Sequence, residues 1–339
     1  MEITLNHRLC RTRDEVLAAA TPQVADFLDE WFSPADFVWG HTSGSTGAPK
    51  PLKLSKRDME ESARLTVDFF GITADTTMLL CLSPDYIAGK MMIVRTLLSG
   101  ADLLVVPPSS RPLATVDEPV DFAAMVPAQV VESLSDDAQR ARLARVGALI
   151  IGGAPLSPAT EARLTQLPVQ AYATYGMTET VSHVALRRIG DATMLYRALG
   201  SITFAVDSRD CLVIHTPHFT HKQFVTNDVV ELVDERTFRW TGRYDHVINS
   251  GGVKIFPERV EQKIAGLLTR RFFIAAAPDE KWGQCVALAI EGDPLSPADE
   301  AALLARIREA VDRYEMPRRV VYLPAFAETS SGKVIRRLP

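Results

Sequence analysis

A nine-residue segment near the start of the sequence has the residue types of a polyphosphate-binding loop. It reads Thr42-Ser43-Gly44-Ser45-Thr46-Gly47-Ala48-Pro49-Lys50. Its four hydroxyl side chains and the backbone N–H groups beside its two glycines can point inward together, and the lysine adds a positive charge. These groups would bind a chain of phosphates, so the segment predicts a nucleotide or polyphosphate ligand.

Two other interpretations of this segment fit it less well. A Walker loop needs four residues between its glycines and a Ser or Thr after its lysine, whereas two residues separate Gly44 from Gly47 and Pro51 follows Lys50. A flexible Ser/Gly linker would have no reason to end in Pro-Lys-Pro or to precede a capped helix.

The composition is that of a folded protein with no general affinity for nucleic acid. The 339 residues include 37 Lys and Arg against 42 Asp and Glu, a formal net charge of −5, and 47% of the residues are hydrophobic. A mildly acidic chain has no basic field that would collect phosphates, so an anionic ligand needs a local site. The four cysteines form no C-x-x-C pair, which argues against a zinc knuckle. With no signal peptide and no apolar stretch near the ~18 residues that span a bilayer, we predict a cytoplasmic protein.

Alternating helices and strands are expected to position the loop. Ser55 and Gly71 are placed to begin and end one helix, and the apolar runs at 78–82, 103–106 and 148–151 are typical of buried strands. A second helix, ended by Gly100, is expected over residues 88–99, and this order implies a right-handed crossover and a parallel sheet. Ligands gather at the carboxyl ends of such strands. We therefore predict an α/β fold with mostly parallel sheets flanked by helices in a large domain over residues 1–243.

The sequence pattern changes after about residue 243, which predicts a second, smaller domain over residues 244–339. The runs at 272–276, 285–290 and 320–323 indicate strands. Ser296 is placed to cap a helix whose apolar face runs from Leu303 to Tyr314. We expect a compact α+β unit of a size that can fold by itself.

Six segments resemble, in the same order, the signature segments of the adenylate-forming superfamily, which contains acyl-CoA synthetases, adenylation domains and luciferases. The loop at 42–50 is the first, and the last is Ser331-Gly332-Lys333-Val334, so the resemblance covers most of the chain. Several segments in the family's order are far more specific than any one of them. The four between are Gly152-Gly153-Ala154, Tyr175-Gly176-Met177-Thr178-Glu179, Thr226-Asn227-Asp228, and Gly242-Arg243-Tyr244-Asp245 with Gly251-Gly252-Val253-Lys254 downstream.

The resemblance implies an enzyme that uses ATP, Mg²⁺ and coenzyme A and forms an acyl-adenylate. Attack of a carboxylate on the α-phosphorus of ATP brings two anions together, so catalysis comes from positioning and cationic charge, without a general base. A mobile C-terminal domain that swings about the hinge residue Asp245 would bring Lys333 to the transition state. The other implied roles are phosphate binding by Lys50 and Thr178, Mg²⁺ binding by Glu179, adenine contact at Gly152, Gly153 and Ala154 beside Tyr175 and Gly176, ribose binding by Asp228 and Arg243, and approach of the thiol along Gly251, Gly252 and Lys254.

Each of these roles has a plain structural alternative, and the chain departs from the family at three points. Lys50 and Lys333 could be surface lysines, and Asp228 with Arg243 could form a surface ion pair. Asn227 stands where the family usually has glycine, and Glu328 where the stretch before the lysine often carries a base. Only 41 residues precede the loop, which predicts a shortened first subdomain, with a homodimer or exposed sheet edges to compensate.

Residues 85–97 occupy the position of a substrate-lining helix in the family. Tyr86, Lys90 and Arg95 lie along it, and His183 follows Glu179 closely enough to line the same pocket. In the o-succinylbenzoate-CoA ligases of menaquinone synthesis, a similarly placed helix carries an arginine for the second carboxylate of the substrate. A structural ion pair is an equally natural role for Arg95, and a satisfied structural histidine for His183.

We therefore predict an AMP-forming acid–thiol ligase that converts o-succinylbenzoate to its CoA thioester, with no nucleic acid or membrane partner. A stand-alone adenylation enzyme that loads another aryl or acyl acid onto CoA or a carrier protein shares every motif above and stays open. A non-enzymatic relic would be expected to have lost Glu179 or Lys333, and both are present.

Overall fold

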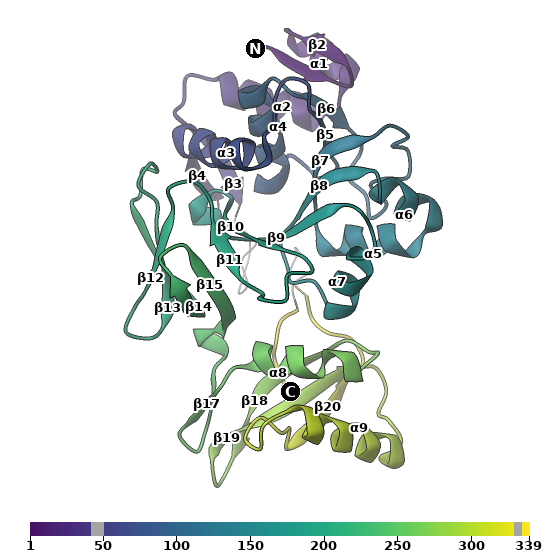
Figure 1. Cartoon of the computed structure of the whole chain (residues 1–339), viewed down its shortest axis with the longest axis vertical. Coiled ribbons are helices and arrows are strands. Elements are labelled where there is room, and N and C mark those ends of the chain that lie inside the picture. The colour runs from purple at the N-terminus through teal and green to yellow at the C-terminus, as the bar shows by residue number, and fades with distance from the viewer. Residues whose placement is uncertain (42–50, 329–333) are drawn as a thin grey trace.

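Six parallel strands form one half of a 13-stranded sheet, and their carboxyl ends share one edge (Figure 1). The computed structural model describes residues 1–41, 51–328 and 334–339, so the predicted phosphate loop at 42–50 and Lys333 lie outside the described residues. The α/β fold with parallel strands flanked by helices that the sequence predicted is confirmed for this half of the sheet. In their order across the sheet the parallel strands are β9 (Gln170–Gly176), β8 (Val146–Ile151), β7 (Val120–Met125), β5 (Thr77–Leu80), β6 (Asp102–Val105) and β1 (Ile3–Leu5), with antiparallel β2 (Arg8–Cys10) at the edge.

Helices cover both faces of these strands because successive strand residues point to opposite sides. In β5, Met78 and Leu80 belong to one buried cluster, whereas Leu79 belongs to another. Ser55 and Gly71 bound α3 as predicted, since Ser55 accepts a hydrogen bond from the Asp58 N–H and Gly71 adopts a left-handed conformation with φ 64°. The helices are α1 (Arg13–Ala19), α2 (Pro22–Phe32), α3 (Lys56–Phe70) and α4 (Ile87–Ser99) on the first face, and α5 (Pro127–Ser135), α6 (Asp137–Leu143) and α7 (Pro158–Leu164) on the second.

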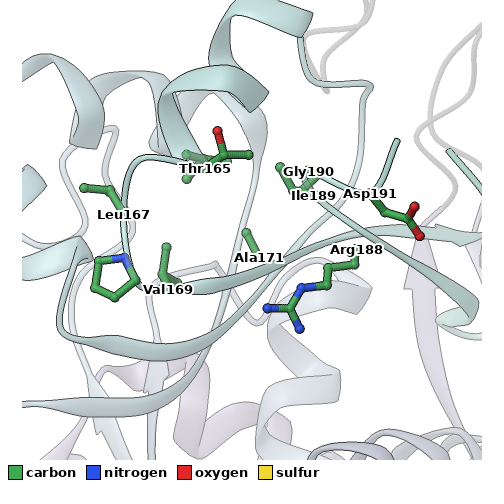
Figure 2. A pocket seen from close by; sticks show the side chains of 10 residues that line it. Thr165, Leu167, Val169, Ala171, Arg188, Ile189, Gly190 and Asp191 are labelled. Carbon is green, nitrogen blue, oxygen red and sulfur yellow. The ribbon is translucent and has the colours of Figure 1, made fainter. Parts of the chain in front are cut away.

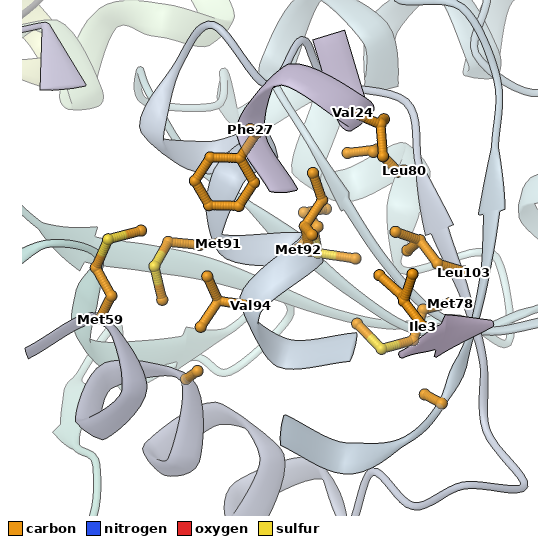
Figure 3. Close-up of a cluster of buried hydrophobic side chains, with 14 of the residues drawn as sticks. Ile3, Val24, Phe27, Met59, Met78, Leu80, Met91, Met92, Val94 and Leu103 are labelled. Carbon is orange, nitrogen blue, oxygen red and sulfur yellow. The ribbon is translucent and has the colours of Figure 1, made fainter. Parts of the chain in front are cut away.

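Helix α4 is buried along most of its length, which fits its nearly continuous apolar sequence. Figure 3 shows Met91, Met92 and Val94 of α4 beside Phe27 of α2 and Met59 of α3. The helix ends at Gly100 with φ 74°, as the sequence predicted. The one arginine of this helix is therefore carried into the interior with its apolar neighbours.

The other half of the large sheet is antiparallel and was not predicted from the sequence. Charged and polar residues interrupt β14, as at Asp228 and Glu231, although β13 contains an apolar run at residues 211–214. Next to β9, in order, lie β10 (His183–Arg188), β11 (Tyr196–Ala198), β15 (Thr237–Arg243), β14 (Gln223–Asp234), β13 (Cys211–His215) and β12 (Thr203–Val206).

Two further strands form a separate antiparallel hairpin around the predicted phosphate loop. Strands β3 (Phe37–His41) and β4 (Pro51–Ser55) pair so that His41 lies opposite Pro51. The nine residues of the loop connect these two positions. The hairpin exposes Trp39, 45% of whose surface is accessible; the predicted homodimer stays a prediction.

Residues after η2 (Tyr244–His246) form a five-stranded sheet with its own buried cluster. The predicted strands at 272–276, 285–290 and 320–323 and the helix capped by Ser296 are confirmed, whereas the boundary at 243/244 stays a prediction. The helix ends at Ala310, so the prediction that it includes Tyr314 is wrong; the Asp312 N–H and the carboxylate of Glu315 form a turn there instead. The elements are β16 (Ile248–Ser250), β17 (Val253–Ile255), α8 (Pro257–Ile264), η3 (Ala265–Leu267), β18 (Phe272–Asp279), β19 (Gly283–Glu291), α9 (Pro297–Ala310) and β20 (Arg319–Leu323).

Within residues 1–41, 51–328 and 334–339, no helix has both the length and the apolar composition needed to cross a membrane. The same residues contain no cluster of three or more His, Cys, Asp or Glu side chains that could hold a metal ion. The four cysteines are buried free thiols.

Candidate active site

Two neighbouring strand ends bring the predicted adenine turn beside the predicted metal-binding segment. Strands β8 and β9 are paired up to Ile151 and Ala173. The next residue of β8's chain, Gly152, lies so close to the Thr174 hydroxyl that a Cβ would overlap it. Gly153 has φ 90°, a left-handed conformation that favours glycine. Both glycines are therefore required by the local geometry at the carboxyl end of the sheet.

A strained turn presents Thr178 and Glu179 at the end of β9. The turn is the short 3₁₀ helix η1 (Thr178–Thr180), and it ends at Val181, which has φ 66° although it is β-branched. Such strain persists only where the surrounding structure holds it, and it gathers at functional sites. The exposed side chain of Glu179 makes no ion pair within the described part of the chain, so its carboxylate is available to a cation.

The predicted ribose ligand Asp228 is held in place by two side-chain donors. The Tyr175 hydroxyl donates to Oδ2 (2.7 Å), and the indole Nε1 of Trp240 donates to Oδ1 (3.1 Å). Burial, and then the charge of Asp228, raise the pKa of Tyr175 well above its ordinary value, so Tyr175 remains a donor. A carboxylate has about four acceptor positions, so Asp228 can still accept hydrogen bonds from a diol. No sequence pattern indicated Trp240, which reaches Asp228 only through the pairing of β14 with β15.

The predicted hinge residue Asp245 is tied to the large sheet by hydrogen bonds. It accepts from Arg243 Nη2 (2.7 Å) and from Asn227 Nδ2 (3.2 Å). Arg243 is farther from Asp228, with 3.8 Å between Nη1 and Oδ1. Asn227, which departs from the family pattern, also accepts from Arg209 Nη1 (3.0 Å). The asparagine therefore bridges Arg209 and the hinge, a contact that a glycine could not make.

Arg95 lies deep in the structure beside the same strained turn. Only 1% of its surface is exposed. Its Nη2 donates to Oγ of Ser182 (3.0 Å), the residue that follows Val181 in the sequence. Its Nη1 lies 3.6 Å from Sδ of Met92. Its Nε has no hydrogen-bond partner, and no carboxylate lies within ion-pair distance among the residues described. Burial lowers the pKa of Arg95 to about 9, so the guanidinium is still a cation at neutral pH.

The other predicted substrate residues on α4 have different surroundings. Lys90 donates to Glu30 Oε2 (3.0 Å) and to the Trp39 carbonyl (2.9 Å), and it lies over the Phe27 ring. These contacts are structural. Tyr86 precedes the helix and is 57% exposed. Substrate contacts for both residues stay predictions.

The predicted thiol-binding residues lie on the hairpin β16–β17 of the smaller sheet. Gly251 and Gly252 have φ 59° and 86°, and the ring of Trp282 covers Gly251 so closely that a Cβ would overlap it. Lys254 is exposed on β17. None of these three contacts Arg95 or Asp228 in the hydrogen bonds of the described residues, and their role stays a prediction.

A separate hollow of about 330 Å³ lies at the opposite end of β9 (Figure 2). Its walls come from the end of α7, the start of β9 and the end of β10, and they include Val169, Ala171, Arg188 and Asp191. It contains none of the residues predicted from the sequence. Gly152, Thr178 and Glu179 lie instead where β8 and β9 end, and Tyr175 of β9 binds Asp228.

Comparison with known proteins gives one family and several relatives. A family described as AMP-binding enzyme matches residues 6–215. The protein of Mycobacterium tuberculosis named "Probable 2-succinylbenzoate--CoA ligase" is 28% identical over 320 residues, 87% of this chain and 81% of the relative. The 2-succinylbenzoate--CoA ligase of Enterococcus faecalis is 25% identical, over 87% of this chain and 67% of that protein.

Two solved structures extend the comparison to three dimensions. An acyl-CoA synthetase (AMP-forming)/AMP-acid ligase II-like protein from Dyadobacter fermentans is 38% identical, with a TM-score of 0.63 over 94% of this chain and 93% of the other. The O-succinylbenzoate coenzyme A synthetase of Bacillus subtilis, in complex with ATP and magnesium ion, is 18% identical, with a TM-score of 0.74 over 88% and 68%. The second likeness shows the shared fold.

Proposed function

The chain belongs to the family of AMP-binding enzymes, and from this premise we propose that it is an ATP-dependent ligase that joins o-succinylbenzoate to coenzyme A. The reaction has two steps. A carboxylate of the acid attacks the α-phosphorus of ATP and expels pyrophosphate, and the thiol of CoA then displaces AMP to form the thioester. The product would serve menaquinone biosynthesis in the cytoplasm. The names of the relatives from M. tuberculosis and E. faecalis support this choice of acid.

The observation that carries the proposal is the buried cation of Arg95. A charge removed from water is costly unless an anion or several hydrogen-bond acceptors meet it. The described residues give Arg95 one hydroxyl and one thioether, and no carboxylate. An acid with two carboxylates could supply the missing anion with one and react with the other. o-Succinylbenzoate has two carboxylates, which distinguishes it from most aryl acids.

The turn after β9 carries residues for both ends of such a substrate, the second carboxylate and the carboxylate that reacts with ATP. Ser182, which binds Arg95, lies three residues after Glu179 and four after Thr178. We assign Thr178 to phosphate and Glu179 to Mg²⁺, which is usually held by one or two carboxylates together with substrate phosphates. When bound, Mg²⁺ would neutralise phosphate charge as pyrophosphate leaves. Asp228, fixed by Tyr175 and Trp240, is assigned to the ribose hydroxyls.

The experiment that tests this function is a pyrophosphate-release assay with ATP and a series of aromatic, dicarboxylic and fatty acids, each with and without CoA. We expect the highest kcat/KM for o-succinylbenzoate and a CoA thioester as the product. Release with a monocarboxylic acid in preference, or transfer of the acyl group to a carrier protein but not to CoA, would contradict the proposal. The second outcome would favour the stand-alone adenylation enzyme.

A further inference from the structure

A continuous chain of hydrogen bonds leads from helix α3 to Arg95, and its direction is fixed at both ends. The Thr66 hydroxyl donates to the Ser62 carbonyl (3.3 Å), which can only accept. The Thr66 oxygen then accepts from the Nε2–H of His183 (3.2 Å). At the other end, Arg95 Nη2 can only donate, and it binds Ser182 Oγ (3.0 Å). The Ser182 hydroxyl in turn donates to Nδ1 of His183 (3.3 Å).

This chain requires a neutral His183 with its proton on Nε2. A cationic imidazole would carry a proton on Nδ1 as well, and Ser182 would lose its acceptor. Burial, and then the nearby charge of Arg95, lower the pKa of His183 well below its ordinary value. Thr66 is fully buried and His183 is 5% exposed, so water does not compete for the bond between them.

This chain of hydrogen bonds holds the guanidinium of Arg95 in place without neutralising its positive charge. A carboxylate at the position of Ser182 would orient Arg95 equally well, but it would cancel the positive charge. The neutral chain instead leaves Nε without a partner, and leaves Nη1 with only the weak acceptor Sδ of Met92, among the residues the structure describes. These N–H groups are the donors that an incoming carboxylate can use.

We infer that Thr66, His183 and Ser182 are positioning residues, which orient Arg95 toward the second carboxylate of the acid while leaving its charge uncompensated. The inference deepens the proposed function and rests on it. His183 acts through Ser182 and Arg95, which differs from the direct substrate contact expected for it from the sequence. The three residues thereby set the preference of the enzyme for a dicarboxylic over a monocarboxylic aryl acid.

Two substitutions of His183 separate positioning from simple packing. His183→Asn keeps an amide oxygen that can accept from Ser182, whereas His183→Phe fills the space and removes the acceptor. The ratio of kcat/KM for o-succinylbenzoate to that for its monocarboxylic analogue should fall about five- to tenfold in His183→Phe, the scale of one lost hydrogen bond, and stay near wild type in His183→Asn. Arg95→Ala is the reference variant, and thermal unfolding of each variant checks the fold.

The outcomes distinguish the positioning role from the proposed function. If Arg95→Ala loses the preference and a folded His183→Phe keeps it, the positioning role is overturned and the function stands. If the wild type shows no preference for an acid with a second carboxylate, the choice of substrate fails. The ¹⁵N chemical shifts of His183 then test separately whether the chain of hydrogen bonds exists. A neutral ring protonated at Nε2 at pH 7 supports the chain; a cationic ring or a proton on Nδ1 overturns it.

Discussion

Two arginines are buried in the large sheet and its helices, and they differ in what meets the charge. Arg187 of β10 is 5% exposed, and Glu161 of α7 binds it through two oxygens, with 2.5 Å from Nη2 to Oε1 and 3.1 Å from Nη1 to Oε2. Arg95 of α4 is 1% exposed and has no carboxylate among the described residues. The described residues therefore supply the counter-charge for one buried cation, and for the other only a hydroxyl and a thioether.

The pKa directions of the two arginines follow from this difference. Burial by itself would lower the pKa of Arg187, but the hydrogen bonds and charge of Glu161 raise it overall. Burial acts alone on Arg95 and lowers its pKa to about 9. A paired buried arginine is a structural element, whereas a buried arginine that is positioned but not paired is the signature of a site for an anion.

The largest effect on stability is expected from breaking the paired site. Arg187→Met removes the cation and leaves the largely buried carboxylate of Glu161 without a partner. Loss of one member of a buried pair typically costs about 3–5 kcal/mol, so the free energy of unfolding should fall by about that amount. Denaturant titration measures it. A loss below about 1 kcal/mol would mean that Glu161 finds water or another donor, and the contrast between the two arginines would lose its basis.

A much smaller effect on stability is expected from the same substitution at the unpaired site. Among the residues that the structure describes, Arg95→Met leaves no opposite charge behind, and it replaces a buried cation by an apolar side chain of similar length. Its free energy of unfolding should stay within about 1 kcal/mol of the wild type or rise above it. A fall as large as that of Arg187→Met would show that Arg95 has a structural partner, and its assignment to substrate would fail.

The features predicted best from the sequence are those that depend on residues close together in the chain. The helix boundaries at Ser55, Gly71 and Gly100 followed from capping and left-handed glycines, since these signals lie within a few residues of each other. Glu179 and Gly152 were predicted as site residues because their short segments resemble those of the family. The pairing of β8 with β9 brings these two segments together.

Contacts between distant residues could not be predicted in the same way. Trp240 reaches Asp228, and Ser182 reaches Arg95, only because the sheet and helix α4 bring together positions 12 and 87 residues apart. The sequence likewise left open whether Arg95 had an ionic partner, because a partner such as Glu161 is visible only in three dimensions. Strand β14 is half-exposed and carries charged and polar residues along its length, and it was missed for that reason, whereas the apolar run at 211–214 in β13 was a signal that the sequence interpretation did not use.

The central claim is that Arg95 receives the second carboxylate of the substrate. Its most direct test is to measure kcat/KM for o-succinylbenzoate and for its monocarboxylic aryl analogue. The measurement is made in the wild type, Arg95→Ala and Arg187→Ala. Charge-assisted hydrogen bonds contribute roughly 1.5–3 kcal/mol, so Arg95→Ala should lower kcat/KM for o-succinylbenzoate by about 10- to 150-fold and affect the analogue much less. Arg187→Ala should change both acids to the same extent. Equal losses with both acids in Arg95→Ala would contradict the claim and make Arg95 a structural residue like Arg187.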